Sequence, residues 1–451
     1  MNVSARQWFE SPVFFMALVL VGSAVIFARN PVAIVYASMY AEDGIWTSLI
    51  YQEGGFASYL NGREDYLVVG NMMLLHIAVL INHLIFGTEN ITRLPEVIAA
   101  VSYGFFAVVA ALPVVALKSY LSLPARLLLS FLILFLPVGP SAHEIFGRVV
   151  NVGFAFVFIA VMIILWRETF RQVAFRAQVL ALDAVVLLCC ATNPIAIGIT
   201  GAYLVFRLAT VRGRSVNDWL LAAGLLPIVI VNAVGIMTVP NNQAGGVVTL
   251  AGLLYTAMAR PLLYPLIFPW YGHLTHAATL VLSALLIALL TAGWRATPHK
   301  TGLGFVLFSV ALTTLVIALQ RPSYVAYLSA YASSYPDRYY HTQNLFVLTA
   351  VIWTADALLR SSAMRLKAAG TAMATTLALI YALHPGHVFA FYGSRQMAPL
   401  GPTFTEQLRQ GRTLGDNAEL MEVEIFPEGW SARYPMRFKP EPQLQTQSQI
   451  K

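Results

Sequence analysis

The amino-acid sequence predicts an all-α polytopic membrane protein with about 11 to 13 transmembrane helices, although several of its apolar runs are shorter than the roughly 20 residues that a span needs. Two observations lead to this prediction. Hydrophobic residues make up 58% of the 451 residues and charged residues only 11%, whereas soluble domains carry about 25% charged residues. The apolar residues are also gathered in runs separated by polar loops. No soluble fold could bury so much apolar surface, so lipid must surround the chain.

The apolar runs can be followed from the N-terminus onward. The first, at 12–28, is followed by no clear small-residue cleavage site, so we interpret it as a retained span rather than a signal peptide. Asn193-Pro194 interrupts the series and predicts a hairpin of two short helices. Arg260 and three prolines within 246–271 predict an interfacial or re-entrant segment. The other runs lie at 66–87, 96–117, 126–139, 150–166, 178–192, 194–206, 218–237, 276–294, 301–319, 342–358 and 369–384.

Basic residues occur in five small groups, and these groups predict which loops face the cytoplasm, because short Lys/Arg-rich loops mark that side. Placing all five there leaves two apolar runs but room for only one crossing between residues 28 and 118. Either the run at 66–87 does not cross fully, which we favour, or Lys118 and Arg126 lie outside. The groups lie at 118–126, 167–176, 207–214, 295–300 and 360–367.

The same alternation places a second set of loops on the outer side. We therefore divide the chain into a transmembrane domain at 1–384, whose first outer loop is 29–65, and a polar, periplasmic C-terminal tail at 385–451. Within the tail, 421–426 alternates as a strand does and is followed by a Pro-Glu-Gly-Trp turn. We expect the tail to cover the outer mouth of the protein. The outer loops after the first lie at 140–148, 238–275 and 320–340.

The first outer loop carries an acidic pair, Glu42-Asp43, and this pair is the leading candidate for a functional site. Charge placed on a scaffold of apolar helices is costly and is a functional-site candidate for that reason. An aromatic-rich stretch from Ile45 to Leu60 follows and predicts an amphipathic, interfacial helix. The alternative is that Asp43 only caps this helix.

Other charged residues of the outer loops are candidate substrate ligands. Arg338-Tyr339 lies just before a span, and a guanidinium offers two donors to an oxyanion; the alternative is an ordinary interfacial anchor. Because loops are where charge belongs, position alone does not make any of these residues functional. The remaining candidates are Arg63 in the first loop and His143, Glu144 and Arg148 at the start of another span.

The remaining chemistry-bearing residues favour structural roles. Cys189 and Cys190 are adjacent in an apolar run and are typical of small helix residues. His76 and His83 lie seven apart and fit a satisfied core pair better than a metal site. The net charge of +7 is dispersed along the chain and therefore indicates no nucleic-acid partner. No metal or nucleotide motif occurs in a credible context.

The combination of these motifs resembles the GT-C class, the polytopic membrane glycosyltransferases, and in particular a bacterial branch of that class that uses polyprenyl-phosphate-linked sugars. The resemblance rests on Ala-Glu-Asp-Gly at 41–44, on Glu144 and Asn151 opening one span, on Arg338-Tyr339 opening another, and on Ile-Phe-Pro-Glu-Gly-Trp at 425–430. It covers most of the chain. The sequence departs from the branch at 62–66, where an apolar stretch with Pro-Arg is more usual.

The resemblance implies a function. Asp43 or Glu42 acts as general base on an acceptor hydroxyl, which displaces the lipid phosphate with inversion, while Arg338, with Arg63 or Arg148, binds that phosphate. The partners implied are a polyprenyl-phosphate-linked sugar, a cell-envelope glycan or lipid acceptor, and membrane lipid. The location implied is the bacterial inner membrane, with the site facing the periplasm.

Two points stay open at this stage, the need for a divalent cation and an alternative function. No cofactor is indicated, although a divalent cation is left open. The alternative function is a transporter or flippase of a lipid-linked sugar, which would show internal repeats and charges near broken helices in the middle of the membrane. The sequence shows no clear repeat, and most charges lie at the ends of the apolar runs. We therefore favour the transferase.

Overall fold

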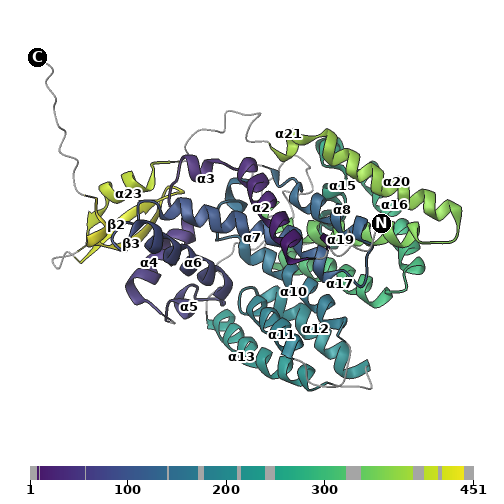
Figure 1. Cartoon of the computed structure of the whole chain (residues 1–451), viewed down its shortest axis with the longest axis horizontal. Helices are drawn as coiled ribbons and strands as arrows, with labels where there is room; N and C mark the ends of the chain where they lie inside the picture. Colours follow the sequence, from purple (N-terminus) through teal and green to yellow (C-terminus); the bar gives the residue numbers. More distant parts are fainter. Residues whose placement is uncertain are drawn as a thin grey trace, which may run out of the picture.

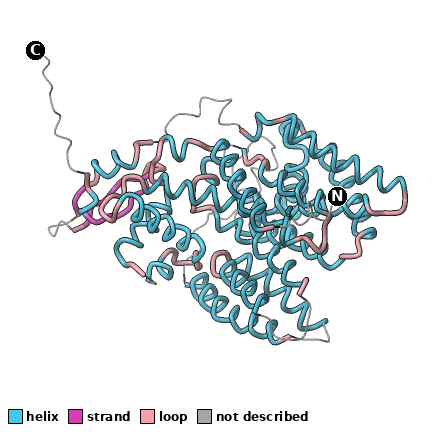
Figure 2. Tube along the Cα trace, in the orientation of Figure 1, coloured by secondary structure: helices cyan, strands magenta, loops and turns pink. Residues whose placement is uncertain are grey.

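The computed structural model describes residues 8–9, 11–55, 57–139, 142–170, 177–210, 215–238, 249–320, 337–389, 401–414 and 419–440. Helices form almost all of this part of the chain, and its strands lie near the C-terminal end (Figures 1 and 2). The prediction of a helical, multi-pass membrane protein is confirmed at this level, because nine of the described helical segments are long and apolar enough to cross a membrane. These are α2 (Pro12–Arg29), α6 (Val69–Phe86), α7 (Leu94–Ala116), α13 (Val216–Thr238), the run Leu250–His273, α16 (His276–Ala296), α17 (Lys300–Gln320), α19 (His341–Leu359) and α20 (Met364–Leu383).

Nine is fewer than the 11 to 13 spans predicted, because several apolar runs form helices too short to span. The described helices α8 (Leu123–Leu134), α11 (Ala177–Cys190) and α12 (Pro194–Thr210) have 12, 14 and 17 residues. At about 1.5 Å per residue, a 12-residue helix covers only about 18 Å of a hydrocarbon core about 30 Å thick. The break predicted at Asn193-Pro194 is confirmed, since α12 begins at Pro194.

Burial separates the helices into a centre and a periphery. Of the candidate spans, α19 is the most enclosed, with 94% of its apolar window buried, whereas the values for α13 and α20 are 17% and 22%. The 17-residue helix α10 (Val152–Glu168) is also almost wholly buried and packs against α7, α11 and α19. The two helices α10 and α19 therefore occupy the interior.

The segment 250–273, predicted to be interfacial or re-entrant, keeps its helix through its prolines and is long and apolar enough to span. It is one continuous helical run of 24 residues, in which α14 (Leu250–Ala257) passes through a π-helical turn at Met258–Leu263 into α15 (Tyr264–Ile267) and a 3₁₀ turn at Phe268–His273. Pro261 lies inside the π-helical turn. A proline lacks the amide donor of a regular helix, and a local π-turn accommodates such a defect without ending the helix.

The helix α6 bears on the question of sidedness. It meets the length and hydropathy criteria of a span, yet both of its ends lie beside segments predicted to be outside. Asn71, near its start, donates to the carbonyl of Val149 at 2.7 Å. Near its end, the Tyr51 hydroxyl lies 3.3 Å from His83 Nε2. These contacts fit the alternative in which the run at 66–87 does not cross the membrane fully.

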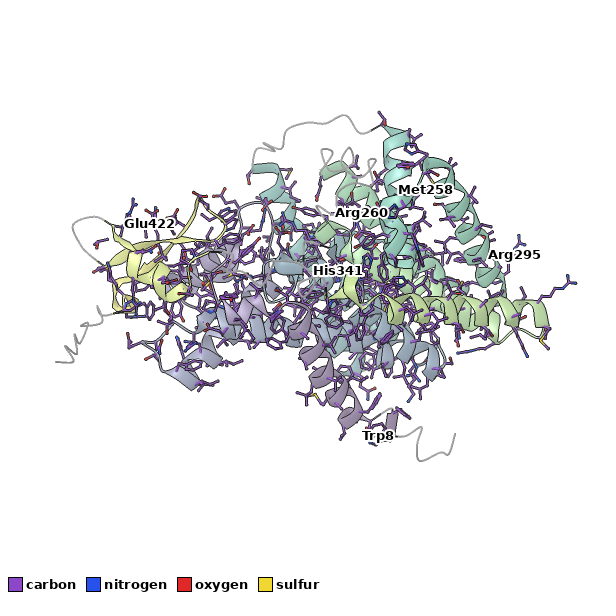
Figure 3. The ribbon with its side chains drawn as sticks, turned by 90° about the horizontal axis from the view of Figure 1, so that it is seen from above. Trp8, Met258, Arg260, Arg295, His341 and Glu422 are labelled. Atoms are coloured by element: carbon purple, nitrogen blue, oxygen red, sulfur yellow. The ribbon has the colours of Figure 1, made fainter. Side chains whose placement is uncertain are left out.

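The described residues of the five basic groups, which leave out 171–176 and 211–214, gather on one face. The Tyr120 hydroxyl donates to the carbonyl of Leu165 at 3.0 Å, and its ring lies 5.1 Å from that of His299. Arg207 Nε lies 3.4 Å from Glu168 Oε1. One cavity of this face is lined by Arg360 together with Tyr120 and Arg295. Lys118 therefore shares this face, called the basic face below, with the other groups. Seen from above, Arg295 on this face and Glu422 of the tail lie at opposite ends of the molecule, with His341 of α19 between them (Figure 3).

The described residues 401–414 and 419–440 of the C-terminal tail fold into a small unit at the end of the molecule opposite to α16 and α20 (Figure 1). It contains α23 (Phe404–Gln410) and a three-stranded antiparallel sheet of β1 (Arg412–Thr413), β2 (Leu420–Ile425) and β3 (Trp430–Pro435). The strand predicted at 421–426 and the turn after it are confirmed within one residue. The inward residues Met421, Val423 and Ile425 are buried.

Candidate functional site

The acidic pair lies in the first turn of α4 (Ala41–Glu53), at the end of the molecule that carries the tail. This turn is where the helix dipole favours negative charge. The helix begins at Ala41, whose φ of 38° is the sole positive φ of a non-glycine residue in the described chain. Such a conformation costs free energy and persists only where neighbouring structure holds it. The start of α4 is therefore a strained position next to Glu42 and Asp43.

The tail holds this strained start of α4 in place. The amide of Ala41 donates to the carbonyl of Phe426, and the amide of Phe426 donates to the carbonyl of Met39 at 3.0 Å. One turn further along α4, the Thr47 and Tyr434 hydroxyls lie 2.8 Å apart. A Cβ on Gly44 would meet Ile425 at 2.6 Å, so the close approach of α4 to β2 requires glycine there.

The helix predicted after the acidic pair is present, but it is not the amphipathic helix expected from the sequence. Its buried residues include Asp43, Thr47 and Ser48 beside Trp46 and Ile50. Polar and apolar groups thus share the covered side, because that side packs against β3 and α6. A second short helix, α5 (Ala57–Asn61), follows it.

Asp43 is a buried carboxylate with one oxygen unsatisfied. Its side chain is 1% exposed, and Oδ2 accepts a hydrogen bond from the amide of Val149 at 2.9 Å. No residue that the structure describes donates a hydrogen bond to Oδ1. Burial raises the pKa of Asp43 from 3.8 to about 7, against the lowering effects of the Val149 and Val150 amides and of Arg148, and with a further raising effect of Glu42. A carboxylate of this pKa exchanges protons near neutrality.

A chain of polar contacts leads from Asp43 to Arg338. The guanidinium of Arg148, whose charge acts on Asp43, lies 4.8 Å from the ring centre of Tyr40. Tyr40 interacts electrostatically with Glu144, and Glu144 Oε2 accepts from Arg338 Nη1 at 2.5 Å. Residues separated by nearly 300 positions thus meet in one network.

A second group of charges covers the more exposed side of the acidic pair. Arg63 donates two hydrogen bonds to Asp65, at 2.8 and 3.0 Å, and its Nη1 lies 4.0 Å from Glu42 Oε1. The Arg63 and Glu42 side chains are 30% and 26% exposed. Tyr66 stacks under Arg63, at 4.5 Å, and interacts electrostatically with Glu42 and Tyr339. This group therefore lies beside the first one.

The structure brings together seven of the eight candidate residues named from the sequence. They are Glu42, Asp43, Arg63, Glu144, Arg148, Arg338 and Tyr339. The side chain of His143, the eighth, lies outside the described residues. Sequence reasoning missed Tyr40 and Tyr66 and the role of Asp65 as the partner of Arg63. The sequence offered only their positions as a signal: Tyr40 precedes Ala41, and Asp65 and Tyr66 follow Arg63 closely.

The residues that the structure describes form no candidate site for metal binding or for thiol chemistry. These residues contain no cluster of three His, Cys, Asp or Glu side chains able to hold a metal ion. His76 stacks on Tyr59 with ring centres 4.8 Å apart, and His83 contacts Tyr51, so each histidine pairs with an aromatic ring rather than with the other. Cys189 and Cys190 are free and buried.

The arrangement can perform a definite kind of chemistry. A carboxylate with a pKa near neutrality can accept a proton, and the guanidiniums around it can bind a phosphate or another oxyanion. Arg338 and Arg63 are both partly exposed, so an anion can reach them from outside. A comparison with protein-family models and a search of curated proteins each gave no match.

Proposed function

We propose that this protein is a membrane glycosyltransferase of the GT-C type, which moves a sugar from a polyprenyl-phosphate donor to a hydroxyl of a cell-envelope glycan or lipid. The observation that supports it most is the meeting of Asp43 and Glu42 with Arg338 and Arg63 at one end of an apolar helical bundle. Base and phosphate ligand must flank the same anomeric carbon, so their convergence is what this reaction requires.

The proposed reaction is one inverting displacement. The acceptor oxygen attacks the anomeric carbon as the bond from that carbon to the phosphate oxygen breaks. The proton of the acceptor hydroxyl passes to the carboxylate, and polyprenyl phosphate leaves with its negative charge. Arg338 and Arg63 stabilise that charge through hydrogen bonds that strengthen as it develops.

We assign the role of base to Asp43 rather than Glu42. Its pKa of about 7 suits a general base that works near neutral pH, and its unsatisfied Oδ1 can accept the hydrogen bond of an acceptor hydroxyl. Because Asp43 is covered, acceptor binding has to open a path to Oδ1. Glu42, paired with Arg63 at the exposed side, contacts substrate in this assignment.

This assignment predicts the pH dependence of transfer. Only ionised Asp43 accepts a proton, so kcat/KM should be low at pH 5 and rise about tenfold per pH unit until it levels off near pH 7. Rates measured on reconstituted protein between pH 5 and 9 check this. In Glu42→Gln the midpoint should fall, because the neighbouring negative charge that raises the pKa of Asp43 is removed. A flat profile would contradict the assignment.

The proposed orientation places the acidic helix and the tail in the periplasm and the basic face in the cytoplasm. A phosphatase reporter that works only in the periplasm should be active when fused after Pro440 and inactive when fused after Ser362, in the basic group at 360–367. A reporter that works only in the cytoplasm should give the reverse pattern. Activity of the phosphatase at Ser362 alone would invert the orientation.

The function itself is tested by mass spectrometry of envelope glycans and lipid-linked sugars from cells with and without this protein. A transferase predicts loss of one sugar substituent together with accumulation of the polyprenyl-linked donor. Purified protein in vesicles should then release polyprenyl phosphate when donor and acceptor are both supplied on the side of the acidic helix. Movement of the intact donor across the bilayer, without release of polyprenyl phosphate, would identify a flippase instead.

A further inference from the structure

A cavity of about 830 Å³ opens at the basic face, far from the acidic helix, between α10, α12 and α17. Its polar lining residues lie at helix ends, with Glu168 at the end of α10, and His299 and Lys300 where α17 begins. Apolar lining residues such as Ile164 and Phe305 lie about one turn further along the same helices. A cavity that is polar at one end and apolar at the other matches an amphiphile.

The charged side chains that line the cavity are two cations, Arg207 and Lys300, and one anion, Glu168. Glu168 accepts a hydrogen bond from the Tyr203 hydroxyl at 2.6 Å and lies 3.4 Å from Arg207, which also pairs with Asp218 at 3.3 Å. Lys300 forms no ion pair with any residue that the structure describes, and it is exposed. The first turn of α17 also lines the cavity through Thr301 and Gly302, and the N-terminal end of a helix favours negative charge.

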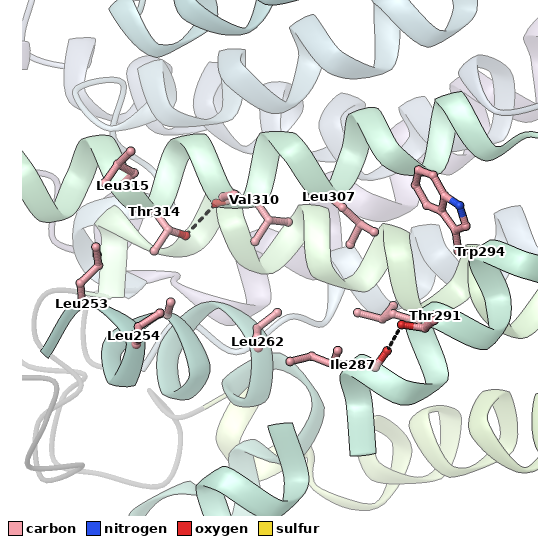
Figure 4. A pocket seen from close by; sticks show the side chains of 13 residues that line it. Leu253, Leu254, Leu262, Ile287, Thr291, Trp294, Leu307, Val310, Thr314 and Leu315 are labelled. Carbon is pink, nitrogen blue, oxygen red and sulfur yellow. Dashed lines mark hydrogen bonds between the residues drawn. The ribbon is translucent and has the colours of Figure 1, made fainter. Parts of the chain in front are cut away.

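An apolar groove of about 490 Å³ lies on the other side of Trp294, between α14, α16 and α17 (Figure 4). Trp294 lines both the groove and the cavity, and its indole lies over Gly304, where a Cβ would come within 2.4 Å of the ring. The threonines of the groove expose little polarity, since Thr291 and Thr314 donate to carbonyls of their own helices. An acyl chain fits such a surface.

From these two features we infer that the basic face binds one acidic phospholipid of the surrounding bilayer. The phosphate of its headgroup contacts Lys300 and His299 in the cavity, and an acyl chain runs past Trp294 into the groove. Cationic pockets between helices on the cytoplasmic side are typical sites for acidic lipid headgroups. This site is separate from the proposed transfer site, and its test does not depend on sugar transfer.

The test is native mass spectrometry of the full-length protein, delipidated in detergent and mixed with phosphatidylglycerol or with zwitterionic phosphatidylcholine. We expect one phosphatidylglycerol to bind more tightly than phosphatidylcholine. Lys300→Ala should weaken that binding about fivefold, the contribution of one basic residue near an acidic lipid. Ala202→Phe, which places a ring in the cavity without changing any charge, should weaken the binding of both lipids.

The matched control is Lys367→Ala, which removes an exposed charge that does not line the cavity and should leave binding unchanged. Equal binding of the two lipids, or equal weakening by Lys367→Ala and Lys300→Ala, would overturn the proposal in favour of diffuse attraction to the basic face. Competition by soluble glycerol 3-phosphate at comparable concentration would also overturn it, because a headgroup without acyl chains would then suffice. Tight phosphatidylglycerol binding in Ala202→Phe would place the lipid elsewhere.

Discussion

Asp43→Asn is expected to reduce sugar transfer at pH 8 by at least about 100-fold, because an amide cannot accept the proton of the acceptor hydroxyl. The amide oxygen of asparagine can still accept the hydrogen bond that the Val149 amide gives to Asp43, so the loop and helix should keep their places. Initial rates with saturating donor measure the effect. The matched control is Asp65→Asn, which removes a partly exposed carboxylate near the same site and should leave more activity.

The same substitution should make the protein more stable at high pH. The pKa of Asp43 is raised in the folded protein from 3.8 to about 7. The neutral form is therefore favoured on folding, and its stabilising contribution is complete below pH 4 and lost as the pH rises toward and past 7. At pH 8 the ionised carboxylate costs about 4 kcal/mol, taking about 1.4 kcal/mol per pKa unit. Asp43→Asn removes this cost, whereas at pH 4 the two proteins should unfold at similar temperatures.

These two results must occur together to support the assignment. Thermal unfolding in detergent at pH 4 and pH 8 gives the stability, and the transfer assay gives the rate. Full transfer activity in Asp43→Asn would remove Asp43 from the mechanism and leave Glu42 as the candidate. Loss of activity with lower stability at both pH values would instead indicate that Asp43 only joins α4 to the loop at Val149.

Arg338→Ala is expected to lower the rate by about 100- to 1,000-fold, the usual effect of removing a donor from a developing oxyanion. Glu144 would lose the cation that pairs with it at 2.5 Å, which adds the cost of a largely buried carboxylate without that countercharge. The transfer rate of Arg338→Lys should lie between those of the unsubstituted protein and Arg338→Ala, because an ammonium keeps the charge but not the bidentate geometry of a guanidinium. The control is Arg93→Ala, which removes an exposed arginine whose partner is Glu96.

The series distinguishes phosphate binding from a structural role. If Arg338 binds the leaving phosphate, Glu144→Gln should retain far more activity than Arg338→Ala, since the arginine is still present. Equal losses in Glu144→Gln and Arg338→Ala, together with a lower unfolding temperature in both, would mean that the ion pair serves only to hold α19 beside the loop at Glu144.

The sequence was sufficient to predict a helical, multi-pass membrane protein and to name most of the charged residues that the structure brings together, but for different reasons. Composition alone requires a membrane environment, and span ends are where charge can lie, so outer-loop charges such as Arg63 and Arg338 were identified one by one. Their pairing was beyond sequence reasoning. Whether Arg338 meets Glu144, and whether Asp43 or Glu42 is covered, depends on how segments far apart in the chain pack.

Two misjudged segments show the limits of local rules. Within 246–271, local rules take Arg260 and Pro261 as signs of an interrupted span. A π-helical turn accommodates Pro261, and the Arg260 guanidinium lies 4.9 and 4.8 Å from the ring centres of Tyr264 and Tyr271. The stretch after Asp43 read as an amphipathic surface helix. Its covered face is polar because the tail, nearly 400 positions away at Tyr434, supplies the partner of Thr47.

The contact between α4 and the tail also sets the order in which this protein can be made. Residues 39–47 are hydrogen-bonded to residues 426–434, so ribosomes must finish every helix between them before the strained start of α4 acquires its support. Because synthesis proceeds at about 5–20 residues per second, on the order of half a minute passes between the synthesis of α4 and that of the tail residues that contact it. A nascent or prematurely terminated chain therefore carries the acidic pair without the contacts that position it, and these contacts form only in a chain whose synthesis has passed Tyr434.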